Sequence, residues 1–295
     1  MDRKDFIKFM ALLPFTPSAM NLHDLKKITD ELPSSSKMPV LFIGHGDPMN
    51  ALRDNPFTKS LHTLGTEIRK SQKPSAILVV SAHWLSRGTF VNVSPKPKTI
   101  HDFGGFPDEL FQVQYAAPGS PEFAKEAIKL SPEIKETTEW GLDHGAWTIL
   151  KHIFPEADIP VFQLSIDYYK PMKYHYELAQ QLKQLREKGV LIIGSGNIVH
   201  NLRMSMEGLY SGNTKPYDWA VQFDALVKKK LEDRDFAGLI AYDKLGSSAA
   251  LSIPTSDHYI PMLYSLGLAD KDEPVTQIYE EVLSGISMRT FKIGK

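Results

Sequence analysis

The chain has 295 residues, of which 42% are hydrophobic and 23% charged, a composition that excludes a disordered protein and predicts a globular one with a sizeable core. Its 34 lysines and arginines are balanced by 35 acidic residues, which argues against a nucleic-acid-binding groove. No segment is apolar over the length of a membrane span. The chain has no cysteine, so disulfides, thiol nucleophiles and zinc ribbons are excluded, and any metal must be bound by His, Asp, Glu or backbone oxygen.

Residues 1–37 form a predicted N-terminal extension that ends in a polar, serine-rich stretch. Arg3 and Lys4 precede a short apolar run at residues 9–13, a pattern that resembles a twin-arginine export signal with lysine in place of the second arginine. The alternative is an amphipathic helical arm that packs on the domain. We expect a cytoplasmic protein, with periplasmic export as the alternative, and a single catalytic domain over residues 38–295.

From Pro39 onward, short β-branched runs alternate with longer amphipathic stretches, which predicts an α/β fold with a mostly parallel central sheet flanked by helices. The predicted strands comprise residues 40–43, 76–80, 159–164 and 190–193. The predicted helices comprise residues 49–71, 121–130, 145–153, 172–188, 218–233 and 260–266. Residues 94–107 form a loop rich in glycine and proline, long enough to indicate a function.

Three of the predicted strands are each followed within seven residues by a histidine: His45, His83 and His200. Ligands of open α/β sheets bind at the carboxyl ends of the strands, so these three side chains are candidate site residues. If the first two strands are neighbours, they lie about 4.8 Å apart, and their imidazoles can share one metal ion.

The remaining histidines divide into candidates and background. His258 precedes an apolar helix and is either a ligand on a loop or part of a capping turn. His101 and His144 lie among aromatic residues and glycines, which is typical of a pocket wall and also of core histidines paired with a carboxylate. We interpret the others as surface or packing residues: His23, His62, His152 and His175.

Four aspartates lie within two residues of candidate histidines, where they either orient an imidazole or favour a turn. They are Asp47, Asp102, Asp143 and Asp257. The segment Gly194-Ser195-Gly196 is not a nucleophile elbow, which argues against a catalytic serine. The glycines around His45 lack the lysine of a phosphate-binding loop.

Six segments together resemble the motifs of the 4,5-DOPA extradiol dioxygenase family, which is LigB-like and belongs to the class III extradiol ring-cleavage enzymes. They are residues 44–50 (GHGDPMN), 81–84 (SAHW), 99–107 (TIHDFGGFP), 115–121 (YAAPGSP), 143–147 (DHGAW) and 197–202 (NIVHNL). The resemblance covers about residues 38–295, in order. Two features depart from the family pattern: the N-terminal segment is longer than usual, and Asp47 stands where serine is common.

The resemblance implies a LigB-like single α/β domain with one divalent metal ion per chain. It places His45, His83 and His258 at metal-ligand positions and His200 at a position that is either a further ligand or the catalytic histidine. His144 matches a pocket histidine near the substrate, and we expect it to take part in catalysis. The aromatic loop around His101 suits the binding of a flat aromatic substrate.

Ring opening of a catechol by O₂ needs a redox metal with open positions, and imidazoles suit Fe(II). With an ordinary pKa near ~6.5, His200 can take a proton from the catechol and return it. We therefore expect L-DOPA or a related catechol and O₂ as substrates, Fe(II) as the active metal and zinc in the protein as purified. The alternatives are a zinc-dependent hydrolase with the same pocket and a metal-binding protein without turnover. The oligomeric state stays open.

Overall fold

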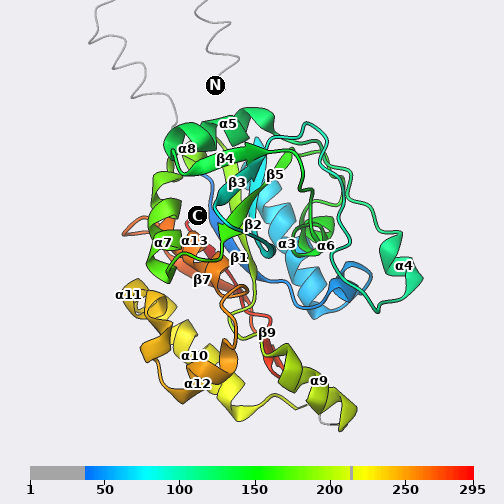
Figure 1. Cartoon of the computed structure of the whole chain (residues 1–295), viewed down its shortest axis with the longest axis vertical. Helices are drawn as coiled ribbons and strands as arrows, with labels where there is room; N and C mark the ends of the chain where they lie inside the picture. Colours follow the sequence, from blue (N-terminus) through cyan, green and yellow to red (C-terminus); the bar gives the residue numbers. More distant parts are fainter. Residues whose placement is uncertain (1–36, 213–214) are drawn as a thin grey trace, which may run out of the picture. The chain divides into compact units, whose positions relative to one another are not determined.

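A mixed eight-stranded sheet carries the fold (Figure 1). The computed structural model describes residues 37–212 and 215–295, so the predicted N-terminal extension lies outside the described residues except for Lys37. The residues from Met38 to Lys295 form one unit by their contacts. None of the described helices has the length and apolar character needed to cross a membrane.

The four predicted strands are all present and form the parallel centre of the sheet. They are β1 (Val40–Gly44), β2 (Ala76–Ser86), β5 (Val161–Asp167) and β6 (Val190–Gly196). The strand order is β4-β3-β5-β2-β6-β1-β10-β7. The supposition that β1 and β2 are neighbours is therefore wrong, because β6 lies between them and pairs in parallel with both.

The strand β2 is longer than predicted. This strand continues past residue 80 to Ser86, and its register with β5 shifts between Val80 and Leu85. His83 thus lies inside the strand rather than after it. Such an irregularity bends a strand and redirects its side chains, which is common next to active sites.

The sequence patterns did not reveal the outer strands of the sheet. They are short and in several cases antiparallel: β3 (Thr89–Asn92), β4 (Ile134–Thr137), β7 (Val275–Tyr279) and β10 (Thr290–Ile293). A separate small hairpin consists of β8 (Val282–Leu283) and β9 (Ile286–Ser287).

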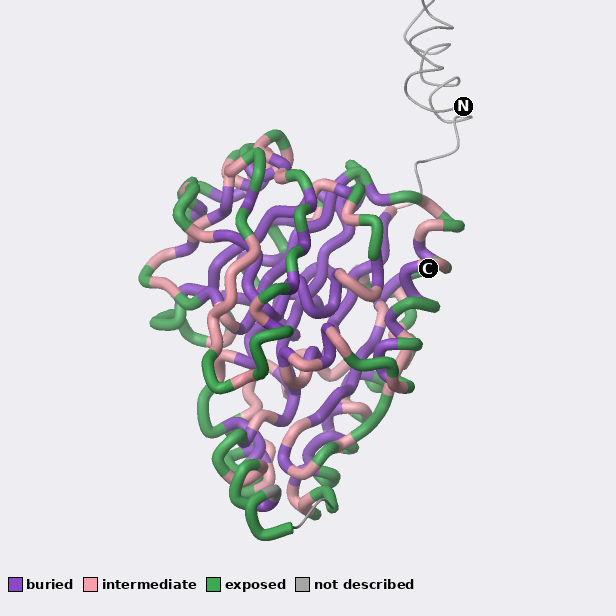
Figure 2. The backbone as a smooth tube through the Cα atoms, turned by 90° about the vertical axis from the view of Figure 1, so that its right-hand side faces the viewer, coloured by how far each residue is buried: buried purple, intermediate pink, exposed green. Residues whose placement is uncertain are grey.

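Helices pack on both faces of the sheet because successive residues of its central strands point to opposite sides. In β1, Val40 and Phe42 belong to one hydrophobic core, and Leu41 and Ile43 belong to another. The helices α3 (Pro56–Ser71) and α6 (His144–Ile153) cover the second core, and α7 (Met172–Gln181), α10 (Asp218–Glu232) and α13 (Ile260–Gly267) cover the first. Figure 2 shows the buried backbone of the central strands between exposed outer turns.

Two predicted helices are each divided in the structure. The first gives η1 (Pro48–Ala51) and α3, because Asn55 and Thr58 form a capping box at the start of α3. The other gives α7 and α8 (Gln184–Glu187). The remaining short helices are α4 (Asp108–Phe111), α5 (Pro121–Leu130), α9 (Leu202–Tyr210), α11 (Phe236–Ile240), η2 (Tyr242–Lys244) and α12 (Ser247–Ser252).

Candidate metal centre

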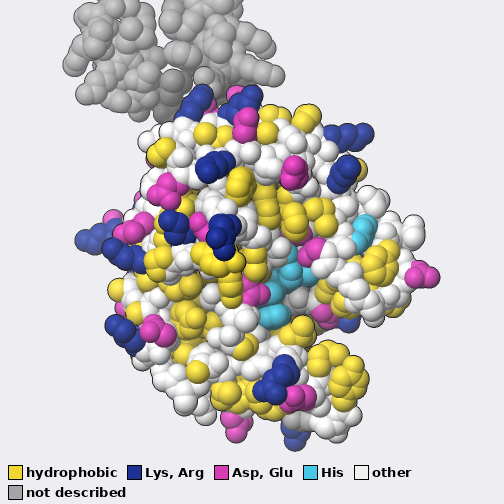
Figure 3. Space-filling model, in the orientation of Figure 1, with side chains coloured by type: hydrophobic (Ala, Val, Ile, Leu, Met, Phe, Trp, Pro, Cys, Tyr) yellow, Lys and Arg dark blue, Asp and Glu magenta, His cyan; other side chains and the backbone are white. Residues whose placement is uncertain are grey.

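Five histidines from distant parts of the chain gather at the carboxyl ends of the central strands. His45 follows β1, His83 lies in β2, His200 follows β6, His144 is the first residue of α6, and His258 precedes α13. Figure 3 shows histidine side chains at the bottom of a hollow, bordered by acidic and apolar side chains. The structure thus brings together every histidine predicted as a metal ligand or catalytic residue.

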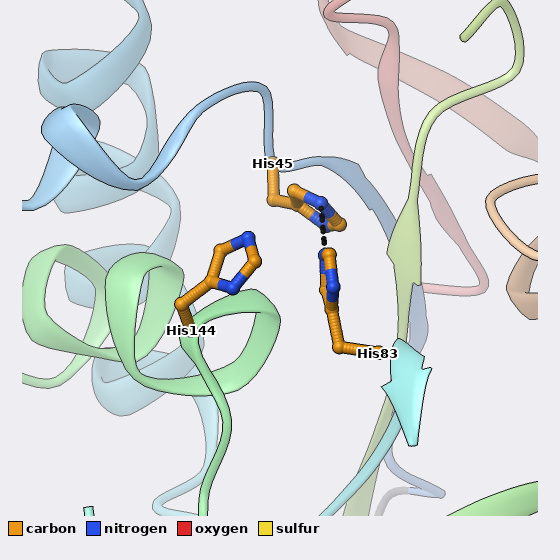
Figure 4. Close-up of side chains that lie close together, drawn as sticks. All are labelled: His45, His83 and His144. Carbon is orange, nitrogen blue, oxygen red and sulfur yellow. Dashed lines mark hydrogen bonds between the residues drawn. The ribbon is translucent and has the colours of Figure 1, made fainter. Parts of the chain in front are cut away.

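His45, His83 and His144 converge from a loop, a strand and a helix (Figure 4). The Nε2 atoms of His45 and His83 are 3.1 Å apart. The rings of His83 and His144 have centroids 3.8 Å apart. One nitrogen from each of the three imidazoles lies within 4.8 Å of the other two, a spacing that can hold a metal ion.

His200 and His258 adjoin this group. Their rings are stacked with centroids 3.5 Å apart. The His258 ring lies 5.3 Å from that of His45 and 5.0 Å from that of His83, between centroids. Together with Asp257, the pair also forms a second group with metal-ligand spacing. The five imidazoles are therefore one continuous cluster.

Ser195 determines which nitrogen of His45 faces the cluster. Its hydroxyl donates to the carbonyl oxygen of Gly145 at 2.5 Å, and its Oγ lies 3.0 Å from Nδ1 of His45. Because the single hydroxyl hydrogen is used by Gly145, Oγ accepts a hydrogen bond from Nδ1 of His45. The lone pair of His45 therefore lies on Nε2, which points at His83.

The glycines on either side of Ser195 permit close packing of the segment that carries His258. A Cβ on Gly196 would lie 2.2 Å from the carbonyl oxygen of His258, and one on Gly194 would lie 2.3 Å from that of Pro261. Only glycine allows such an approach without movement of the backbone. Sequence reasoning, which set aside a nucleophilic role for Ser195, missed its contact with His45 and the close packing beside it, for which the paired glycines were the available signal.

Two of the four aspartates near histidines contact an imidazole. Asp257 Oδ2 accepts from Nδ1 of His258 at 2.6 Å, and Asp102 Oδ2 accepts from Nδ1 of His144 at 2.8 Å. The other two are caps: Asp47 accepts from the backbone of Met49 at the start of η1, and Asp143 caps α6. Both interpretations that the sequence left open are therefore realised, each at two positions.

Comparison with known proteins identifies the family. Residues 36–290 match the family model described as the catalytic LigB subunit of aromatic ring-opening dioxygenase. The chain belongs to the LigB family. The expectations of an α/β LigB-like fold and of an extradiol ring-cleavage dioxygenase, an oxidoreductase, are thereby confirmed.

Relatives of this LigB chain span nearly its whole length. A protein of Escherichia coli (strain K12) named 4,5-DOPA dioxygenase extradiol is 43% identical over 277 residues, which cover 90% of this chain and 98% of the relative. A protein of the same name from Beta vulgaris is 36% identical over 83% of this chain and 92% of its own length. The crystal structure of an uncharacterized protein from Escherichia coli K12, with 40% sequence identity, matches with a TM-score of 0.75 over 87% of this chain and 100% of its own.

The donor set of this LigB chain fits the metal that the family uses. Ligand nitrogens bound at about 2.0–2.1 Å are about 2.9–3.4 Å apart at tetrahedral or octahedral angles, which matches the 3.1 Å between Nε2 of His45 and of His83. Nδ1 of His83 lies 3.4 Å from Asp102 Oδ2, and this carboxylate favours the tautomer of His83 with the proton on Nδ1. Two lone pairs then face each other, an arrangement that a shared cation stabilises.

Burial favours the neutral form of His45, His83 and His200, and a histidine must be neutral to bind a metal. Desolvation, followed by the neighbouring histidines His258 and His144, holds the pKa of His45 well below 6.5. Desolvation likewise lowers the pKa of His83, with His144 as the next cause. The pKa of His200 is lowered to about 3, again by burial first and then by His258, so the ordinary pKa expected from the sequence does not hold for this residue.

An aromatic wall adjoins the cluster on the side of His144. Phe103 meets the ring of His144 edge-on at 5.5 Å between centroids and also contacts Trp147. His101 also contacts these aromatic rings: its ring centroid is 5.9 Å from that of Phe103, and its Nε2 is 3.0 Å from the carbonyl oxygen of Val113. The structure places His144 in the cluster and His101 beside its wall.

The three background histidines among the described residues do not belong to the cluster. His175 is fully buried between α7 and α13, where its Nδ1 is 3.2 Å from Tyr264 Oη. His152 is 2.7 Å from the carbonyl oxygen of Asn50 through Nε2, and His62 is exposed on α3. His23 lies outside the described residues.

Proposed function

We propose that this LigB-family dioxygenase opens the ring of L-DOPA, or of a closely related catechol, with O₂ and that its active metal is Fe(II). The observation that carries the proposal is the convergence of five imidazoles in a chain of this family. Two relatives that span most of the chain are named 4,5-DOPA dioxygenase extradiol, which supports the choice of catechol.

In the proposed site, His45, His83 and His258 hold the metal. In each of them Nδ1 faces an oxygen atom, of Ser195 for His45 and of an aspartate for the other two, so Nε2 is available to bind the metal. Three imidazoles leave coordination positions open for substrates, and a redox-active ion such as Fe(II) supplies the route for electrons from the catechol to O₂.

Two histidines are left to handle protons and substrate. His200, stacked on His258, takes the proton of a catechol hydroxyl on its imidazole and returns it as the ring opens. His144 contacts the substrate through Nε2, since its Nδ1 is bound to Asp102. Phe103 and the loop around His101 form the apolar side on which a flat ring can lie.

Oxygen uptake after anaerobic loading with Fe(II) tests the proposal. We expect O₂ consumption and a yellow semialdehyde product with L-DOPA, and comparison with dopamine and catechol defines the need for the amino-acid group. His45→Ala, treated identically, is the control and should consume no O₂. Absence of uptake with every catechol would contradict the proposal, and ester hydrolysis by the zinc-loaded protein would then favour the hydrolase alternative.

Two finer expectations accompany this proposal. Metal analysis of protein purified without added iron should find zinc, because imidazoles bind Zn²⁺ tightly. We propose a cytoplasmic location and a catalytic domain over residues 38–295. N-terminal sequencing of the protein recovered from cells tests the location, since removal of residues 1–37 would instead indicate export.

A further inference from the structure

The carboxylate of Asp102 binds His144 at two points. Asp102 lies in the loop that leads to α4, and His144 begins α6. Its Oδ1 accepts from the backbone nitrogen of His144 at 2.8 Å, and its Oδ2 accepts from the ring Nδ1, also at 2.8 Å. Oδ2 is also 3.4 Å from Nδ1 of His83. One side chain thus fixes both the backbone and the ring of His144.

An ionised carboxylate accepts hydrogen bonds and has none to donate. Both oxygens of the Asp102 carboxylate accept from nitrogens of His144, one from the backbone and one from the ring. The ring nitrogen beside Asp102 must therefore carry the proton. In a neutral imidazole the lone pair then lies on Nε2.

We infer that Asp102 is a positioning residue for the reaction: it holds the proton of His144 on Nδ1 and thereby presents an unprotonated Nε2 to the substrate. The inference deepens the proposed function and rests on it for the role of His144. Asp102 does not itself contact the reacting atoms. It acts through the orientation and tautomer of His144, and its longer contact of 3.4 Å faces Nδ1 of His83.

Asp143, although adjacent to His144 in sequence, is committed elsewhere. Its Oδ1 accepts from Ser81 at 2.7 Å and from the backbone of Ala146 at 3.2 Å. Its Oδ2 accepts from Gln163 at 2.8 Å and from Trp140 at 3.2 Å. Asp143 is thus tied to β2, β5 and the start of α6, and the carboxylate at the His144 ring comes from a different loop.

The position of this loop also links the imidazole to the aromatic wall. Phe103, the next residue, contacts the edge of the His144 ring with centroids 5.5 Å apart. The same short segment therefore supplies the acceptor that selects the tautomer and the apolar surface beside the ring. A displacement of the loop would change both features together.

The tautomer of His144 can be measured directly in metal-free, ¹⁵N-histidine-labelled protein by long-range ¹H–¹⁵N spectroscopy. The signals of His144 are assigned by their loss in His144→Gln. We expect a single Nδ1–H form in the wild type. In Asp102→Asn the side-chain NH₂ group can face Nδ1 of His144 and donate to it. The proton of the imidazole then moves toward Nε2, or the two tautomers become mixed. Asp108→Asn, an exposed aspartate of α4, is the matched control and should leave the spectrum unchanged.

Two further variants keep the test decisive. Asp102→Glu retains a carboxylate and should preserve the Nδ1–H form at least in part. If Asp102→Asn does not fold, Asp102→Ala replaces it, and His144 should then lose its single tautomer. An unchanged His144 tautomer in the folded variant that lacks the carboxylate would overturn the inference.

Kinetics with Fe(II)-saturated protein give the functional measure. Asp102→Asn should lower kcat by about 10–100-fold. Asp108→Asn should keep the wild-type kcat, and wild-type kcat in Asp102→Asn would overturn the positioning role. If the wild type fails to consume O₂ with any catechol while the tautomer still depends on Asp102, the proposed function fails and the control of His144 by Asp102 stands.

Discussion

The hydroxyl of Ser195 connects the backbone of Gly145 to the ring of His45, with distances of 2.5 Å and 3.0 Å. Ser195 lies in β6, the strand that separates β1 from β2 in the sheet. The strand between the two histidine-bearing strands therefore supplies the residue that orients one of the imidazoles. His45 and His83 meet, with Nε2 atoms 3.1 Å apart, although their strands are not neighbours.

Ser195→Ala should weaken metal binding by about 10–100-fold, because His45 then loses the acceptor that keeps its lone pair on Nε2. Competition with a chelator of known affinity measures the effect. Ser265→Ala is the matched control, since Ser265 is also buried but donates to the carbonyl oxygen of Leu41 and contacts no histidine. Equal metal affinities in the two variants would contradict the role of Ser195.

The metal ligands can be separated from the substrate contact by comparing His258→Ala with His144→Ala. We expect loss of bound metal in His258→Ala, as in His45→Ala and His83→Ala, because each removes one of three proposed ligands. His144→Ala should retain the metal and lose turnover. Metal analysis after dialysis decides the matter, and circular dichroism checks the fold. Metal retention in His258→Ala with loss in His144→Ala would instead assign the group His45, His83 and His144 as the ligands.

His200→Gln should slow turnover by on the order of 10²–10⁴-fold at saturating Fe(II), as expected when a positioned acid or base is removed. Metal affinity should fall much less, since the other proposed ligands remain. Oxygen-uptake rates and iron titrations on the same preparation provide both values. Near-normal turnover would show that His200 transfers no essential proton.

The sequence predicted the centre of the fold well because buried parallel strands and their histidines carry strong local patterns. It failed at β3, β4 and β10, which are short and pair with strands that lie far away in the sequence. The same limit applied to the site. His45, His83 and His200 could be recognised because they lie near the ends of predicted strands. The contact between Asp102 and His144 instead joins a loop to a helix, and the two residues are 42 positions apart in the sequence. No local pattern encodes such a contact.

Family motifs supplied part of what local patterns could not. His258 alone was equally consistent with a capping turn, and the resemblance placed it with His45 and His83. The structure adds the reason: Gly194 and Gly196 let the His258 segment pack directly on β6. Neither source indicated that Ser195 would contact an imidazole, because serine is common in turns and sheets for unrelated reasons. For Asp102 the sequence left open that it orients an imidazole, but it did not indicate that the ring would be that of His144.

The last prediction concerns stability and involves a histidine outside the site. His175 is fully buried, and burial lowers its pKa from 6.5 to about 4. Between about pH 6.5 and pH 4, the unfolded chain binds a proton at this residue that the folded protein does not, so the free energy of unfolding falls as the pH falls through this window. The pKa shift sets an upper limit of about 3 kcal/mol for the loss. Urea unfolding of wild type and His175→Gln across this range should show a shallower pH dependence in the variant, whereas His62→Gln, at an exposed position on α3, should follow the wild type. The same slope in all three proteins would show that His175 takes up its proton equally in both states.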